Sequence, residues 1–300
     1  MPNRTPSRSA LVAAFAAIYV IWGSTYLGIA VALESLPPFT LAAFRFLVAG
    51  GVLTAWALAR GAARPTRQQL AMTALLGFLF LVIGNGGVVW AEQRVPSGLT
   101  SLLVAVTPIW TALAIWALPG GRAPSGGMIV GLVTGFLGTA LLVAPGHVGG
   151  APVDTAGAVA LNLASLSWAL GSVLTPRLDL PRSGPLSSGL QMLSAGVMLF
   201  LVALASGDFA RFDPSAVTAR SLAALLYLIV FGSLVAFSAF AWLLQVSTPA
   251  RLSTTSYVNP VVAVFLGWLL AGEPVSLRTF IAGGLIVGAV AVIVTVRGRR

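Results

Sequence analysis

Ten apolar runs divide this sequence, and each is close to the roughly 20 residues that a helix needs to cross the hydrocarbon core of a bilayer. They lie at 10–33, 38–59, 70–91, 97–118, 126–144, 155–176, 186–206, 217–243, 251–271 and 278–296. Short segments carrying proline, glycine and nearly all of the charge separate them. The runs lack the alternation of a membrane β-barrel strand, so they predict ten transmembrane helices in an all-α membrane protein.

The composition excludes several classes of protein. Only 8% of the 300 residues are charged, whereas about a quarter of a soluble domain is charged. The chain has no cysteine and a single histidine, His147, which leaves no thiol chemistry and no zinc site to expect. The runs contain no Ser-Lys, paired Asp or His-based constellation, so we expect no enzyme, no metal and no cofactor.

All 17 basic residues are arginine, and their positions orient the chain. With the amino terminus in the cytoplasm, 12 arginines lie on the cytoplasmic side and four on the opposite side, while Arg45 lies inside the second run. The excess predicts that both termini are cytoplasmic. The net charge of +10 therefore orients the chain in a lipid bilayer and indicates no nucleic-acid partner.

The first run contains Ala30-Val31-Ala32, which resembles a signal peptidase site. The run is longer than the ~7–15 apolar residues of a signal peptide, so we expect it to be the first helix.

An internal repeat is visible when the sequence is shifted by 152 positions. The shift superposes Trp90 on Trp242, Gln93 on Gln245, Pro108 on Pro260 and Trp116 on Trp268. We expect one repeat over 1–150 and a second over 151–300, with five helices each. Five is odd, so the second repeat enters the membrane from the opposite side. Inverted repeats are typical of carriers that expose a central site to each side in turn, whereas a channel more often uses a ring of identical subunits.

Several segments resemble a known family. These are Trp22-Gly23-Ser24, Pro38 followed by Phe44-Arg45-Phe46, and the stretch 253–283 with Pro260 and Gly272-Glu273. Together they resemble EamA-type members of the drug/metabolite transporter superfamily, and the resemblance covers essentially the whole chain. It implies a small-molecule exporter of the bacterial inner membrane, with helices 1–4 and 6–9 around a central cavity. The first repeat has Gly120-Gly121 in place of Gly272-Glu273, so we expect Glu273 to be a structural residue at a helix end.

The resemblance also implies that helices five and ten lie to one side of the cavity. Both carry glycines at spacings that allow close helix contact, namely Gly131, Gly135, Gly138, Gly283, Gly284 and Gly288. These glycines serve either packing within the chain or a dimer surface. We expect a monomer, with a dimer through helices five and ten as the alternative.

The expected substrate is a small amphipathic metabolite. The length and aromatic content resemble those of amino-acid exporters of the family, which favours amino acids with aromatic or other apolar side chains. All seven acidic residues fall in loops or at helix ends, so no midplane carboxylate is available for proton coupling. We therefore expect alternating access driven by the substrate's own gradient. Export of drugs or other metabolites, and a channel, are the alternative functions.

The candidate cavity residues are the aromatic and polar side chains on the helices that the resemblance places around the cavity. They are Trp22, Tyr26, Asn85, Trp90, Trp168, Phe237, Trp242, Ser253, Tyr257 and Asn259. Core packing is the alternative for the tryptophans, and interhelical hydrogen bonding is the alternative for the polar stripe of Ser253 and Tyr257. Asn85, flanked by glycines, serves either the cavity or a hinge.

Two prolines and one arginine complete the candidates. Pro108 and Pro260 are expected to kink helices four and nine and to act as hinges. Thr107 and Asn259 either satisfy the carbonyls that the prolines free or face the cavity. Arg45 either plays a structural role, snorkelling or pairing with Glu34 or Glu92, or binds a substrate carboxylate.

Overall fold

The computed structural model of the chain describes residues 7–117, 125–143, 147–148, 151–152, 154–247, 252 and 254–298. Helices of the first repeat are α1 (Arg8–Ala32), α2 (Pro38–Ala59), α3 (Arg67–Gly77), η1 (Phe78–Asn85), α4 (Gly86–Ala91), α5 (Ser97–Val104), α6 (Thr107–Ala117) and α7 (Gly126–Val143). Those of the second are α8 (Thr155–Leu174), η2 (Thr175–Arg177), α9 (Gly184–Ala205), α10 (Asp208–Arg211), η3 (Pro214–Ala216), α11 (Ala219–Tyr227), η4 (Leu228–Phe237), α12 (Ser238–Val246), α14 (Thr255–Ala271) and α15 (Leu277–Gly298). A two-stranded antiparallel hairpin, β1 (His147–Val148) and β2 (Ala151–Pro152), lies between α7 and α8.

Apart from this short hairpin, the regular elements of the described residues are helices, which confirms an all-α membrane protein. Seven helical segments are long and apolar enough to cross a bilayer, and they correspond to the predicted helices one to four and six to eight. Three shorter apolar helices, Gly126–Leu141, Val258–Ala271 and Leu277–Val292, correspond to helices five, nine and ten. Trp56, Trp116 and Trp268 are each more than half exposed, as outward-facing residues of an interfacial belt must be.

The crossing of α2 and α9 shows the inverted symmetry of the two repeats. A Cβ atom on Gly50 would overlap the backbone nitrogen of Leu193, and one on Gly196 would lie 2.7 Å from the backbone nitrogen of Leu47. The two contacts are equivalent, because 193 − 47 and 196 − 50 both equal 146. Glycine at both positions lets the two backbones pack closely. Likewise, α1 packs on α14, and α8 packs on α5 and α6.

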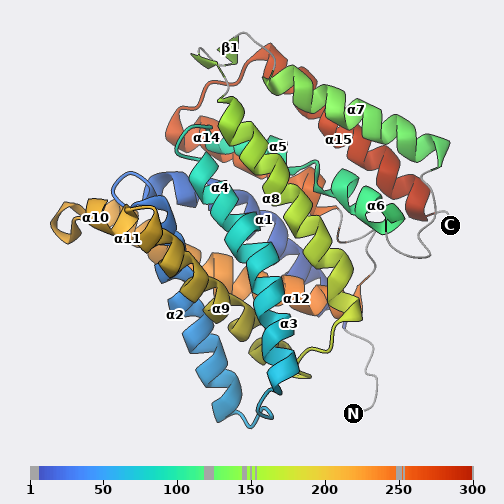
Figure 1. Cartoon of the computed structure of the whole chain (residues 1–300). Coiled ribbons are helices and arrows are strands. Elements are labelled where there is room, and N and C mark those ends of the chain that lie inside the picture. The colour runs from blue at the N-terminus through green and yellow to red at the C-terminus, as the bar shows by residue number, and fades with distance from the viewer. Residues whose placement is uncertain are drawn as a thin grey trace.

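Helices α7 and α15 form a separate pair at one edge of the molecule, where Figure 1 shows them side by side. Gly138 faces α15, since a Cβ atom there would lie 2.8 Å from Ile286. Gly135 lies between α6 and α15, since a Cβ there would overlap Ile109 and lie 3.3 Å from Ala289. These two glycines therefore serve packing within the chain. Gly284 and Gly288 have open space beside them.

Helices three and eight contain wide turns that the sequence patterns did not indicate. In both, a π-helical segment replaces the regular α-helix, η1 in the first repeat and η4 in the second. The segments occupy equivalent places, since residue 78 shifted by 152 is residue 230, within η4. A π-helical turn loosens the regular bond ladder and often lies at a functional site.

Candidate functional site

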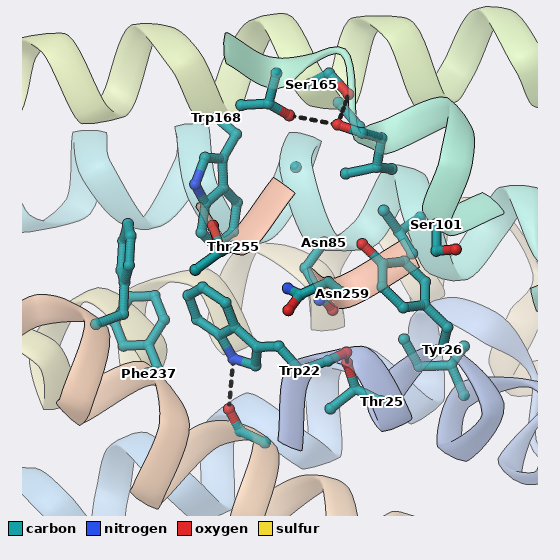
Figure 2. A pocket seen from close by; sticks show the side chains of 18 of the residues that line it. Trp22, Thr25, Tyr26, Asn85, Ser101, Ser165, Trp168, Phe237, Thr255 and Asn259 are labelled. Carbon is teal, nitrogen blue, oxygen red and sulfur yellow. Dashed lines mark hydrogen bonds between the residues drawn. The ribbon is translucent and has the colours of Figure 1, made fainter. Parts of the chain in front are cut away.

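A central cavity of about 150 Å³ lies between helices of both repeats. This is about ten times the ~15 Å³ that one water molecule needs, so the space admits a small metabolite. Lining residues come from α1, α2, η1, α4, α5, α6, α8, η4, α12 and α14. Figure 2 shows the labelled side chains around this space, including Trp22, Tyr26, Asn85, Trp168 and Asn259.

Aromatic rings form one wall of the cavity. The indoles of Trp22 and Trp168 meet edge to face at 5.6 Å between centroids, and Phe240 lies 4.9 Å from Trp22. Phe80 lies 4.9 Å from Trp168 behind this wall. The Trp22 indole nitrogen donates to the carbonyl of Gly232 at 3.3 Å, which fixes the ring orientation (Figure 2). The two repeats thus contribute one tryptophan each to an apolar surface.

Behind part of this wall lies a second cavity, of about 340 Å³. Phe237 and Phe240 line both cavities, so their rings stand between the two spaces. Helix α9, which does not line the first cavity, contributes Gln191 to the second. The structure therefore places a space on each side of an aromatic partition.

Most cavity hydroxyl groups donate to backbone carbonyls. Thr25 donates to Trp22 at 2.7 Å, and Ser101 donates to Gly98 at 2.6 Å. Their oxygen atoms then remain available mainly as hydrogen-bond acceptors. A ligand in this cavity is accordingly expected to offer N–H or O–H groups to them.

The carbonyl of Val104 shows how helix four is built. Pro108 has no N–H to donate to it, and Thr107 donates to it instead at 2.7 Å, with Ser165 also donating at 3.4 Å. Figure 2 draws the Ser165 bond. Thr107 also lines the cavity, so it fulfils both of the alternatives left open for it.

The two prolines are not equivalent in the structure, in contrast to the expectation. Helix four is interrupted at Ala105 and Val106, and Pro108 belongs to the first turn of α6. Pro260 lies inside the continuous helix α14, as expected. Thr107 satisfies the Val104 carbonyl and so allows the break at Pro108. Whether either proline is a hinge stays a prediction.

Asn259 contacts the first helix. In the amide orientation that satisfies both the oxygen and the nitrogen of its side chain, the nitrogen donates to the carbonyls of Ile18 at 3.3 Å and Tyr19 at 3.2 Å. Beside it, Gly23 brings α1 close to α14, because a Cβ there would lie 2.6 Å from Val262. The glycine of Trp22-Gly23-Ser24 therefore seats α1 against α14.

Arg45 and Asn85 bring polar atoms without protein partners to the cavity. Arg45 is 4% exposed, and its Nη1 has no hydrogen-bond partner among the described residues. The same holds for Oδ1 of Asn85, at the end of η1. Buried polar groups are usually satisfied, so these two atoms are candidates for contact with a bound molecule.

The acidic residues lie at helix ends. Glu34 pairs with Arg220 at 3.5 Å, so its expected alternative of pairing with Arg45 is wrong. Glu92 directly follows α4, and neither of its buried carboxylate oxygens has a hydrogen-bond partner in the described structure. Glu92 acts on Arg45 electrostatically, although no ion pair between them forms among the described residues. No acidic residue appears among the described residues that line the central cavity.

Six of the ten candidate cavity residues line the central cavity, namely Trp22, Tyr26, Asn85, Trp168, Phe237 and Asn259. Trp90 lies outside this lining, with the guanidinium of Arg94 over its ring at 4.3 Å. Trp242 packs instead against a cluster that includes Ile18 and Leu243. Ser253 and the side chain of Tyr257 lie outside the described residues. Binding roles for all ten remain predictions.

Further lining residues that the sequence patterns did not indicate are Thr25, Ser101, Ser165, Ser233, Phe240 and Thr255. A second shift of the sequence, by 146 positions, points to equivalent residues around the cavity. It superposes Trp22 on Trp168, Arg45 on Gln191 and Gly50 on Gly196, since each pair differs by 146. The shift of 152 fits the later helices of each repeat and hides these earlier matches.

Comparison with known proteins gives consistent results. Residues 8–144 and 155–295 each match the EamA-like transporter family. The chain is 39% identical over 284 residues to a protein of Escherichia coli strain K12 named as the uncharacterized inner membrane transporter YedA, covering 94% of this chain and 90% of the relative. It is 29% identical to Protein PecM of Dickeya dadantii, over 90% of this chain and 85% of that protein. A crystal structure with 24% identity matches with a TM-score of 0.66, covering 98% of this chain and 100% of that one, which supports the fold.

Proposed function

Because this chain belongs to the EamA-like transporter family, we propose that it exports small amphipathic metabolites across the bacterial inner membrane, with amino acids that carry aromatic or other apolar side chains as substrates. Its 39% identity to a protein named as an inner membrane transporter supports the transport role and this location.

One observation carries the proposal. The central cavity is bounded by helices of both repeats, and its lining combines an aromatic wall with two residues that carry buried polar atoms without a hydrogen-bond partner among the described residues. Ligand sites are typically apolar clefts with a small number of polar groups that orient the ligand. An amino acid with an apolar side chain matches both parts of this surface.

Alternating access follows from the position of the cavity. A site between inverted repeats is exposed to each side when the bundles rock, and aromatic rings already separate this cavity from the second one. Since the described lining carries no carboxylate, we propose movement down the substrate gradient without obligatory proton exchange. A monomer with both termini in the cytoplasm completes the proposal.

Transport by the purified full-length chain in liposomes tests the proposal. Counterflow of labelled phenylalanine and leucine is expected without an imposed pH gradient, while glucose and a quaternary ammonium drug are expected not to move. A variant Trp168→Ala should lower turnover, because it removes the indole that meets Trp22. The matched control Trp268→Ala alters a 55% exposed residue and should transport like the parent. Movement of the drug with no counterflow of amino acids would contradict amino acids as substrates and favour drug export, the alternative function.

A further inference from the structure

Arg45 is the one charged residue among the described residues that line the central cavity. It lies about two turns inside α2, and its guanidinium stands 4.9 Å from the centroid of the Phe46 ring. Burial of an unpaired charge is costly, so a guanidinium at this depth needs compensating partners. Its surroundings show how much of that compensation the protein itself provides.

The protein holds this side chain from one side only. The Nε atom of Arg45 donates to the hydroxyl of Ser233 at 2.9 Å. The neighbouring Gly232 leaves the necessary room, because a Cβ there would lie 2.9 Å from Nη2 of Arg45. The backbone of η4 therefore forms a seat for the guanidinium beside the cavity.

The other side of the guanidinium is unsatisfied. Nη1 is buried and has no hydrogen-bond partner among the described residues. Both ion pairs found in the described part of the chain involve other arginines, Arg211 with Asp208 and Arg220 with Glu34. A carboxylate is the natural partner for the remaining N–H groups, since guanidinium and carboxylate match in geometry and charge.

We propose that Arg45 binds the carboxylate of the transported molecule, an inference that rests on the transport function proposed above. Asn85 supplies the complementary group, because its unpartnered Oδ1 accepts from an N–H or ammonium group. The indoles of Trp22 and Trp168 then receive the apolar part of the molecule. The substrate class is thus narrowed to amphipathic carboxylates, and permanently cationic compounds are rejected.

The two repeats differ at the position of Arg45, so only one end of the bound molecule meets a guanidinium. The shift of 146 superposes Arg45 on Gln191 of α9. Gln191 is neutral, lines the second cavity and donates to Ser187 at 3.2 Å. The second cavity therefore lacks an equivalent cation at this place, so the bound molecule has one orientation relative to the two repeats.

Ligand binding to the purified full-length chain in detergent tests the inference, read out by quenching of tryptophan fluorescence. The probes are phenylalanine, 3-phenylpropionate, which lacks the amino group, and phenylalaninamide, which lacks the carboxylate. Arg45→Gln introduces the residue found at the equivalent position, and it should weaken binding of both carboxylates by about tenfold or more. Phenylalaninamide should bind the parent and Arg45→Gln with equal affinity. That affinity should be at least about tenfold weaker than the affinity of the parent for phenylalanine. Arg220→Gln, which alters an arginine paired with Glu34, is the matched control and should bind like the parent.

Two further variants keep the test decisive if Arg45→Gln does not fold. Arg45→Lys keeps the charge and loses the planar fork, and Ser233→Ala removes only the partner of Nε; both should bind the carboxylates more weakly than the parent. Carboxylate binding unchanged in these variants, or a parent that binds phenylalaninamide as well as phenylalanine or binds no carboxylate, overturns the inference. Transport of amides and cations without carboxylates would overturn it and leave the transport function intact. Carboxylate binding through Arg45 without movement across liposomes would instead overturn the transport function alone.

Discussion

Glu273, just beyond the end of α14, accepts hydrogen bonds from both the backbone nitrogen and the hydroxyl of Ser97 at 2.7 Å each. Its second carboxylate oxygen accepts from the backbone nitrogen of Gly98 at 2.9 Å. These donors belong to the first turn of α5, where backbone N–H groups lack helical partners and attract a negative charge. Glu273 of the second repeat therefore caps α5, the start of helix four in the first repeat, which is the structural role expected for it at a helix end.

Replacing Glu273 with Ala is expected to destabilise the fold by about 2 kcal/mol or more, because hydrogen bonds to a charged group contribute ~1.5–3 kcal/mol. Glu273→Gln should cost less, since an amide oxygen still accepts from Ser97. The melting temperature in detergent measures both. Glu34→Ala, at an exposed carboxylate, is the control and should change stability by less than ~1 kcal/mol. An equal fall in the two Ala variants would show that the cap is energetically unimportant.

Glu92→Gln is expected to stabilise the protein, and more so at high pH. Burial raises the pKa of Glu92, which directly follows the third span, and Glu273 raises it further. The folded state then keeps a proton that the unfolded state, with a pKa of about 4.3, has lost, so stability falls as pH rises above that value. The difference in melting temperature between variant and parent should therefore grow from pH 5 to pH 8. A constant difference would show that the carboxylate titrates normally in the fold.

The same variant examines energy coupling. Glu92→Gln should leave counterflow without a pH gradient within a few fold of the parent, because no carboxylate was found in the described cavity lining. Its reference is the parent protein in the same liposomes with and without a proton gradient. A strict need for that gradient, abolished by Glu92→Gln, would replace facilitated diffusion with proton exchange.

The proline pair is expected to govern turnover more than stability. Pro260→Ala restores a backbone N–H donor inside α14, worth about 1 kcal/mol as a hydrogen bond. Pro108→Ala adds an N–H in the first turn of α6, where the Val104 carbonyl already accepts from Thr107, so the gain there is smaller. The melting temperature should hold or rise while turnover in liposomes falls, since straighter helices bend less easily. Pro108→Ala and Pro260→Ala, measured singly, distinguish the effect in the interrupted helix four from the effect in the continuous helix α14. Unchanged transport at unchanged stability would mean that the prolines only shape packing.

Membrane orientation is open to a direct test. Reporter fusions at Gly61 and Arg300 should report the cytoplasm, and fusions at Gly149 and Asp208 should report the opposite side. The reason is that segments rich in arginine stay in the cytoplasm during insertion, and 12 of the arginines lie in the segments assigned to that side. The fusions at Gly61 and Asp208 serve as internal references for opposite sides. A fusion at Arg300 that reports the opposite side would contradict an even number of spans.

Local patterns were sufficient for the helices and for the repeat. Transfer of a run of apolar residues into lipid depends on the run itself, so the ten spans followed from composition along the chain. The matched Trp90 and Trp242 likewise revealed the duplication from residue identity alone. The expectation that these two tryptophans line the cavity is not met, because the face that a residue presents depends on how its helix is rotated against its neighbours. Trp22 and Trp168 point into the cavity, whereas Trp90 lies under Arg94.

Hydropathy and residue identity at fixed spacing were enough to predict the spans, the inverted repeat and the family resemblance. Tertiary structure alone decided the contents of the cavity. Gly50 and Gly196 set how closely α2 and α9 cross, and Gly232 leaves the room in which Arg45 reaches Ser233. The capping of α5 by Glu273 likewise joins residues 176 positions apart. Such contacts arise from helices packing against one another, and no pattern within a single helix encodes them.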